Sequence, residues 1–346
     1  MPRRFSSSRR SVSIPVNART SVVLPWSTWP AVPTITLLFI SILSVSPYWA
    51  SAQTPESTDL TFQSGVSNVR IDVQVTEQDG SLVTGLTKED FAIFDEGKPQ
   101  PILYFGREAE PLSLLLLVDV SGSTRQFVEQ IATVARDSLR YLQPKDRVAV
   151  MLFARRSRVA LQWTDDRGAV ASELKRAAGL DPTLGAGTSI NEALIDAAKY
   201  VDSSAGETGR RAVLILTDNL GLNYKNPDPP VVAAFTAADT VLNAIVVGKG
   251  RRPEAVSGNM YQNPDFTSPD VFGLSEATGG EAVKAERAAQ AFGRMIERIR
   301  TRYSLHYNKP EGAAPGFRRV EVMLSPTARQ RHAQAVLRYR KGYRIQ

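Results

Sequence analysis

An unbroken apolar run that ends in a cluster of side-chain oxygens constrains this chain more than any other feature. Residues 112–118 read Leu-Ser-Leu-Leu-Leu-Leu-Val, and Asp119, Ser121 and Ser123 follow at alternate positions. A short apolar run of this kind is typical of a strand that is buried on both faces of a parallel sheet. Apolar residues then recur at helical spacing after Thr124, so the three polar side chains occupy a strand-to-helix turn. In open α/β sheets such turns are where ligands bind.

The three oxygen-bearing side chains suit Mg²⁺, Mn²⁺ or Ca²⁺ better than zinc, because no histidine lies nearby and the chain has no cysteine. The alternative is structural: Ser123 caps the following helix and Asp119 accepts backbone hydrogen bonds, as these residue types often do in turns. The motif alone leaves both interpretations open.

Two later segments place further side-chain oxygens beside predicted helices and strands. Gly185-Ala186-Gly187-Thr188 leads into a helix, where Ser189 and Glu192 have the spacing of a capping box. The apolar residues 212–216 lead into Thr217-Asp218-Asn219, which puts a carboxylate directly after another buried strand. Each segment alone has an ordinary explanation, as a helix cap or a strand end.

Buried strands alternate with helices between residues 109 and 302, which predicts an α/β fold: a mainly parallel sheet with helices on both faces. Short alternating strands precede and follow this region. We expect them to form one small β-sandwich-like domain; the alternative is two separate β extensions. The expected organisation is a signal peptide at 1–52, an N-terminal β segment at 53–108, the α/β domain at 109–302, and a C-terminal β segment at 303–346 that packs with 69–105.

The order of the three loops, each in its predicted context, resembles the von Willebrand factor type A domain over about residues 109–302. The resemblance implies a Rossmann-like fold with a metal-ion-dependent adhesion site. By motif, Ser121 and Ser123 resemble the direct metal ligands, and Thr188 resembles the hydroxyl that binds directly or through water. Asp119 and Asp218 resemble the outer carboxylates that hold coordinated waters. Many type A domains have glycine where this chain has Ala186, a departure that leaves the hydroxyl of Thr188 unaffected.

The flanks are similar to the VWFA-related acidobacterial-type family of exported proteins. The matching segments include Asp90-Phe91-Ala92-Ile93-Phe94-Asp95-Glu96-Gly97 and the closing Arg340-Lys341-Gly342-Tyr343. This wider resemblance implies no defined activity.

The amino-terminal region has the features of an export signal. An arginine- and serine-rich stretch precedes the apolar residues 34–45, which are fewer than the ~20 needed to span a bilayer, and Ala50-Ser51-Ala52 has the form of a cleavage site. The alternative is an uncleaved anchor. Residues 1–52 also hold five arginines and no acidic residue; without them the balance is 37 basic against 35 acidic side chains. A nearly neutral mature chain gives no argument for nucleic-acid binding.

These features predict an exported, divalent-cation-dependent protein-binding module of the periplasm, cell surface or extracellular space. Its ligand would be a protein that presents an Asp or Glu carboxylate to a bound Mg²⁺, Mn²⁺ or Ca²⁺. The alternatives are an envelope scaffold whose metal only orders the loops, and a hydrolase, for which no general base is evident near the site. His306 and His332 are expected to be structural or surface residues. The basic residues of the last two strands could bind an anionic lipid or polymer, but we expect a solvated face.

Overall fold

The computed structural model describes residues 68–345, apart from 107–109, 180, 207–208, 222, 225–226 and 254–265. The predicted signal peptide at 1–52 and the segment 53–67 lie outside the described residues. Within the described ranges, no helix combines the length and the apolar composition that a membrane span requires.

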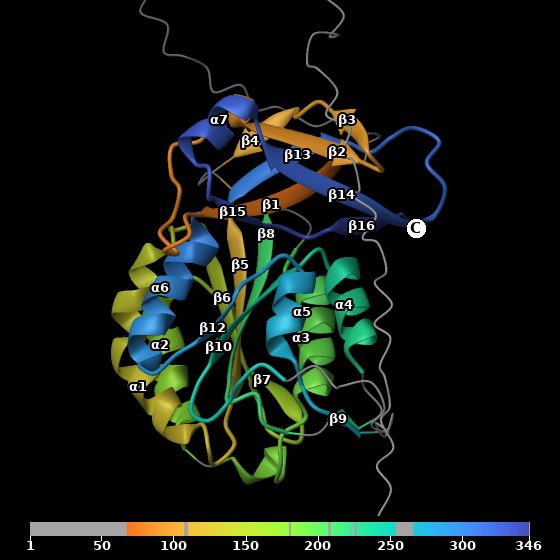
Figure 1. Ribbon diagram of the computed structural model, residues 1–346. Helices are drawn as coiled ribbons and strands as arrows, with labels where there is room; N and C mark the ends of the chain where they lie inside the picture. The colour runs from red at the N-terminus through yellow and green to blue at the C-terminus, as the bar shows by residue number, and fades with distance from the viewer. Residues whose placement is uncertain are drawn as a thin grey trace, which may run out of the picture. The chain divides into compact units, whose positions relative to one another are not determined.

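A six-stranded sheet with the order β12-β10-β8-β5-β6-β7 forms the centre of the α/β region (Figure 1). All neighbouring pairs are parallel except β6 and β7, which are antiparallel. Strand β5 carries the apolar run: Leu114 and Leu116 point to one face of the sheet, Leu115 and Leu117 to the other, and all four are buried. Burial on both faces explains why the run does not alternate. The strands are β5 (Leu112–Asp119), β6 (Arg147–Phe153), β7 (Ser157–Thr164), β8 (Arg210–Thr217), β10 (Val241–Val246) and β12 (Ala282–Lys284).

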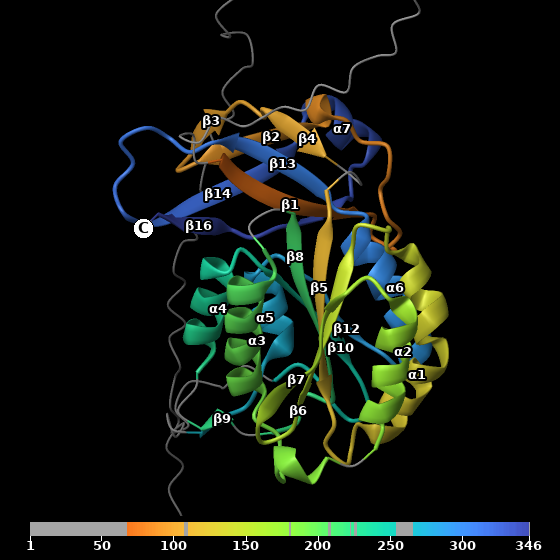
Figure 2. The same ribbon diagram turned by 180° about the vertical axis from the view of Figure 1, so that it is seen from behind.

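Helices cover both faces of this sheet (Figures 1 and 2). One face packs against α1 (Arg125–Ser138), α2 (Arg167–Ala177) and α6 (Ala288–Arg300). The other packs against α3 (Ile190–Ser204), α4 (Asp228–Ala237) and α5 (Val271–Ala277). The buried residues of α6, Ala288, Phe292, Met295, Ile296 and Ile299, recur at the helical spacing that an amphipathic helix requires.

The flanking strands build two four-stranded antiparallel sheets, with the orders β15-β1-β13-β4 and β16-β14-β2-β3. Both sheets mix strands from before and after the α/β region, and their inner faces share one hydrophobic cluster. The predicted fold class is therefore confirmed, whereas the exact domain boundaries stay a prediction. The bounds are β1 (Asn68–Thr76), β2 (Phe91–Asp95), β3 (Lys98–Gln100), β4 (Tyr104–Gly106), β13 (Tyr303–Asn308), β14 (Gly316–Leu324), α7 (Pro326–Arg331), β15 (Val336–Arg338) and β16 (Gly342–Ile345).

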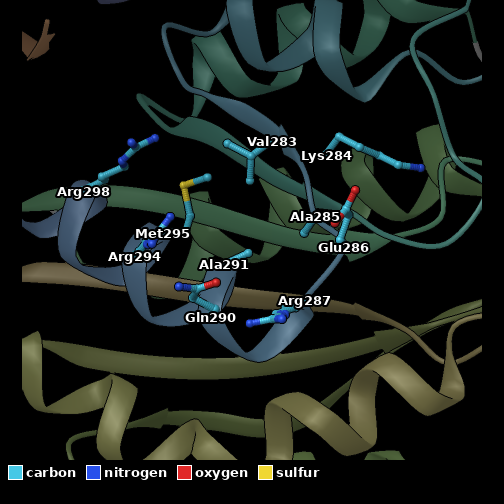
Figure 3. Close-up of a pocket in the computed structure, with 10 residues that line it drawn as sticks. All are labelled: Val283, Lys284, Ala285, Glu286, Arg287, Gln290, Ala291, Arg294, Met295 and Arg298. Carbon is cyan, nitrogen blue, oxygen red and sulfur yellow. The ribbon is translucent and has the colours of Figure 1, made fainter. Parts of the chain in front are cut away.

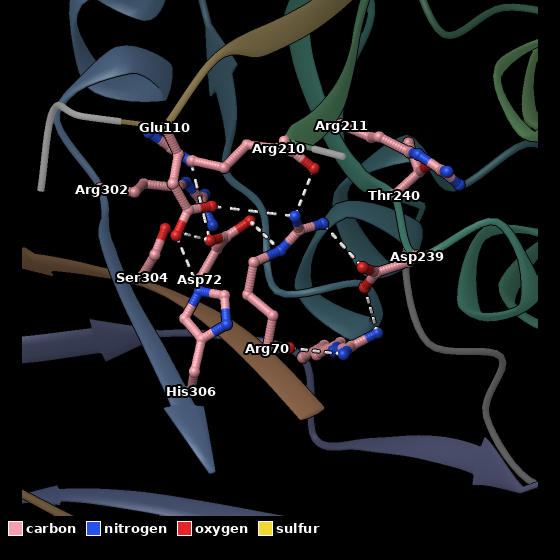
Figure 4. A network of polar contacts seen from close by, with 12 residues as sticks. Arg70, Asp72, Glu110, Arg210, Arg211, Asp239, Thr240, Arg302, Ser304 and His306 are labelled. Atoms are coloured by element: carbon pink, nitrogen blue, oxygen red, sulfur yellow. Dashed lines mark hydrogen bonds and ion pairs between the residues drawn. The ribbon is translucent and has the colours of Figure 1, made fainter. Parts of the chain in front are cut away.

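A network of buried charges joins these flanking sheets to the starting ends of the parallel strands (Figure 4). On β1, Asp72 lies 3.8 Å from Nε of Arg70 and 3.6 Å from Nε of Arg210, the first residue of β8. Arg210 also donates to the carbonyl oxygens of Ile299 at 2.6 Å and Arg300 at 2.9 Å, at the end of α6. Removing one member of such a buried ion pair would leave an uncompensated charge, so the loss of a single partner should destabilise this junction. The opposite end of the sheet, where the parallel strands finish, is left for the candidate site.

Four of the basic residues near the carboxyl terminus contact other groups of the described chain. Arg331 pairs with Asp90, and Arg340 pairs with Asp239 at 2.5 Å. Arg338 donates to the hydroxyl of Thr76, and the ammonium of Lys341 lies over the ring of Tyr339. Each imidazole also has a carboxylate partner at 2.7 Å: His306 pairs with Glu110 and His332 with Glu77.

Candidate metal centre

The turn between β5 and α1 places two serine hydroxyls next to each other, just after the buried carboxylate that ends β5. Oδ1 of Asp119 accepts a hydrogen bond from the backbone N–H of Ser121 at 3.0 Å. The Oγ atoms of Ser121 and Ser123 then lie 3.3 Å apart. Thr124 fixes the turn from below, because its buried hydroxyl donates to the carbonyl oxygen of Asp119 at 2.6 Å.

Ser123 does not cap the helix that follows it. The first residue before α1 is Thr124, and no side chain makes a capping hydrogen bond there. The structural alternative for Ser123 is therefore wrong, and its exposed hydroxyl is left for another role.

The end of β8 lies beside this turn because β5 and β8 are parallel neighbours in register, with Val118 opposite Leu216. The next residue of β8, Thr217, donates its hydroxyl hydrogen to Oδ2 of Asp119 at 2.8 Å. Asp218 follows, only 2% exposed, and its Oδ1 accepts from the backbone N–H of Leu220 at 3.1 Å. A direct hydrogen bond thus ties the first loop to the third.

The loop that holds Thr188 is placed by backbone contacts with both neighbours. The N–H of Ser189 donates to the carbonyl of Ala154, just after β6, at 2.9 Å. On the other side Gly221 packs against Thr188: a Cβ on Gly221 would lie 2.7 Å from the carbonyl oxygen of Thr188. Ser189 makes no side-chain capping bond, so the possible capping box is absent. The structure therefore brings Thr188 to the segment that follows Asp218.

Two buried carboxylates without a basic partner dominate the electrostatics. Asp119 is fully buried, and its pKa is raised to about 6: burial and the charge of Asp218 raise it, while the hydrogen bonds from Ser121 and Thr217 partly oppose the rise. Among the residues that the structure describes, no arginine or lysine forms an ion pair with Asp119 or Asp218. Burying a carboxylate without a compensating positive charge costs folding free energy. A cation bound at this site would reduce that cost.

The donor set fits a hard divalent cation better than zinc. It offers hydroxyl and carboxylate oxygens, the ligands that Mg²⁺, Mn²⁺ and Ca²⁺ prefer. In the described part of the chain, no group of three His, Cys, Asp or Glu side chains forms a metal-binding cluster, so any cation at this edge would depend on hydroxyl oxygens. The residues Asp119, Ser121, Ser123, Thr188 and Asp218 stay the predicted metal set.

Thr217 and Asn219 belong to the third motif, but the sequence alone assigns them no role. Thr217 supplies the bond between the two loops, and Asn219 adopts a left-handed backbone with φ of 52°. The side chain of Asn219 donates to the carbonyl of Arg251 at 3.0 Å and accepts from the N–H of Val271 at 3.3 Å. Asn tolerates positive φ better than most residues, and this was the only local signal for its role. The sequence could not indicate its contacts with Arg251 and Val271.

Glycine at position 250 is required by close packing on the site. A Cβ there would lie 1.9 Å from the carbonyl oxygen of Asp218. The segment after β10 therefore covers the backbone of the third loop.

Comparison with known proteins gives a family match within the α/β region. Residues 114–221 match the family model of the von Willebrand factor type A domain, and comparison with curated proteins gives no match. Among solved structures, the chain is similar to an aerotolerance-related membrane protein from Bacteroides fragilis NCTC 9343, with 16% identity and a TM-score of 0.41 over 54% of this chain and 98% of that one.

Two further solved structures show similar levels of likeness. A von Willebrand factor type A protein from Catenulispora acidiphila has 13% identity and a TM-score of 0.42, over 82% of this chain and 75% of that one. Proximal thread matrix protein 1 from the mussel byssus, with zinc in its MIDAS motif, has 13% identity and a TM-score of 0.44, over 60% and 50% of the two chains. Likeness this distant carries no argument about function.

Proposed function

Because this chain contains a von Willebrand factor type A domain, as its loop motifs predicted, we propose that it is a divalent-cation-dependent protein-binding module. The observation that carries the proposal is the pair of buried carboxylates, Asp119 and Asp218, beside the adjacent hydroxyls of Ser121 and Ser123. Within the described residues nothing basic compensates these carboxylates.

The residues of the candidate metal centre would have the roles that the family resemblance implies. Ser121, Ser123 and Thr188 would be the hydroxyl ligands, and Asp119 and Asp218 would orient coordinated waters. Mg²⁺ keeps several waters, and neutral hydroxyl ligands leave its charge poorly neutralised, so a bound cation supplies an electrophilic position for a partner's carboxylate.

The loops around the site would select the partner. Strand β9 (Asn223–Tyr224), in the segment after Asp218, pairs with β11 (Phe266–Thr267), which ends the long segment after β10. Asn219 joins the same two segments through Arg251 and Val271. These contacts support a rim made of both segments. Met260 and Tyr261, residue types that are enriched at protein interfaces, lie outside the described residues.

Export to the periplasm, cell surface or extracellular space belongs to the same proposal and rests on the sequence of residues 1–52. No chemistry at the site requires a catalytic role, since recognition of a carboxylate needs a held cation and an open position only. The proposal therefore names a partner protein with an exposed Asp or Glu, and no substrate.

The test is cation-dependent binding by the full chain. Mg²⁺ or Mn²⁺ should raise the melting temperature by mass action, and a peptide with a single exposed Glu should bind only with the cation present and be released by EDTA. Asp119→Ala should remove both effects. The control is Asp137→Ala, which changes an exposed acidic residue on α1.

Two outcomes would contradict the proposal. An equal metal response of Asp119→Ala and the unmodified chain would place the cation elsewhere. A metal response at the site without binding of any carboxylate-bearing peptide or protein would favour the scaffold alternative, in which the cation only orders the loops.

A further inference from the structure

A basic groove lies at the outer edge of the parallel sheet, between β12 and α6 (Figure 3). Its volume is about 510 Å³. Four basic side chains and one acidic side chain line it: Lys284, Arg287, Arg294, Arg298 and Glu286. The groove is separate from the loops of the candidate metal centre, and the family model ends at residue 221, well before it.

Two of the four cations have no partner within the described part of the chain. Arg298 pairs with Glu281 at 2.6 Å, and Lys284 donates to the carbonyl of Gly248 at 2.6 Å. By contrast, Arg287 and Arg294 are exposed and form no ion pair with any described residue. Arg294 lies on α6, and Arg287 is the extended residue directly before the first turn of that helix. Figure 3 shows both along the wall that α6 gives to the groove.

The opposite wall offers an open strand edge. Strand β12 ends the sheet, and among the described strands it pairs with β10 alone. The N–H of Ala244 donates to the carbonyl of Glu281, and the N–H of Ala285 donates to the carbonyl of Val246. Residues 281, 283 and 285 therefore face β10, and the backbone groups of Ala282 and Lys284 face outward, since these directions alternate along a strand. An unpaired edge of this kind is a template for another strand.

We propose that this groove binds an extended acidic segment of a partner protein, which adds to β12 as a further strand and sets its carboxylates against Arg287 and Arg294. Strand addition uses main-chain hydrogen bonds for affinity and side-chain contacts for specificity. Guanidinium groups pair with carboxylates through charge-assisted hydrogen bonds. The site needs no cation, so it adds a second recognition surface to the proposed metal-dependent one.

The dimensions favour a peptide over a small anion. The helical wall from Ala288 to Arg298 spans about 15 Å at 1.5 Å per residue, which matches about five residues of extended chain at 3.3 Å each. A small anion would contact the guanidinium groups and leave the strand edge unused. The groove also contains the apolar side chain of Val283 and that of Met295, which would contact alternate side chains of a strand.

The test uses a fluorescent peptide that alternates Glu and Val over about six residues, added to the full chain in EDTA and followed by anisotropy. We expect saturable binding that weakens with salt, as surface ion pairs do. The double variant Arg287→Glu and Arg294→Glu should weaken it about tenfold or more, the loss expected from two ion pairs. The matched control, Arg136→Glu and Arg329→Glu, makes the same charge change at exposed positions elsewhere and should bind normally.

Three results would overturn the inference. A Lys/Val peptide that binds equally well would show that the charges are not used. A Glu/Val peptide with alternate N-methylated amides that binds equally well would show that no strand is added. Peptide binding that is seen with a divalent cation and lost in EDTA would place the peptide at the metal loops. Because the groove is tested without free cation, the groove proposal and the metal-centre proposal can be contradicted independently.

Discussion

Replacing Asp119 by Asn should stabilise the metal-free protein and abolish its response to metal. The carboxyl group of Asp119 is fully buried, and its pKa is raised from 3.8 to about 6. A group with a raised pKa in the folded state binds its proton more tightly there than in the unfolded chain. Ionisation therefore costs folding free energy as the pH rises from about 4 to about 6, and the full cost remains at pH 7.

The pKa shift sets the size of this effect. About two pKa units correspond to roughly 3 kcal/mol at 1.36 kcal/mol per unit. Asn is neutral at every pH, and its carbonyl can still accept from the N–H of Ser121. Its amide replaces the oxygen that accepts from Thr217, which offsets about 1 kcal/mol. In EDTA at pH 7 we therefore expect Asp119→Asn to be about 1–3 kcal/mol more stable than the unmodified chain.

Urea unfolding in EDTA at pH 7 and pH 4 measures this difference. The advantage of Asp119→Asn should shrink or reverse at pH 4, where the carboxyl group is protonated. Added Mg²⁺ or Mn²⁺ should stabilise the unmodified chain by about 4.1 kcal/mol at a thousand times the Kd and the variant much less, so the order of stabilities inverts. Asp137→Asn, on the exposed side of α1, should change neither result.

The reasoning would be refuted if Asp119→Asn were less stable than the unmodified chain in EDTA by the same amount at both pH values. That outcome would mean that the hydrogen bonds of the carboxylate, and not its charge, control the stability of the loop.

Three further predictions concern the junction, the loop packing and the amino terminus. Asp72→Asn should cost about 3 kcal/mol in urea unfolding at pH 7, because it leaves Arg210 buried without its carboxylate partner. Burial raises the pKa of Asp72, but Arg70 and Arg210 lower it to about 2. The stability that Asp72 contributes is therefore complete above about pH 4 and is lost as the pH falls towards 2, where the difference from the variant should close. Gly250→Ala should weaken metal binding about tenfold in calorimetry, since its Cβ would collide with the carbonyl oxygen of Asp218. The control is Gly122→Ala, whose Cβ meets nothing within 4 Å. Equal metal affinities of the two variants would contradict the packing argument. Amino-terminal sequencing of exported protein should begin at or near Gln53, and a sequence that still contains residues 37–45 would establish an anchored chain.

The sequence alone determined the elements whose signals are local. The run at 112–118 predicted a strand buried on both faces, because a strand covered by helices needs apolar residues at every position. The three loop motifs predicted the family domain that the family model confirms. Short segments were missed: α5 and α7 have seven and six residues, too few for a helical period to emerge from the pattern.

Tertiary structure decided the contacts between residues far apart in the sequence. The bond from Thr217 to Asp119 joins residues 98 positions apart, and it depends on the order of strands in the sheet, which no local pattern specifies. The same holds for Asp72 and Arg210, and for Gly250 against Asp218. The local spacing of residues determines which side chains share one face of a helix or strand. The pairing of distant elements depends instead on packing interactions that involve the whole chain.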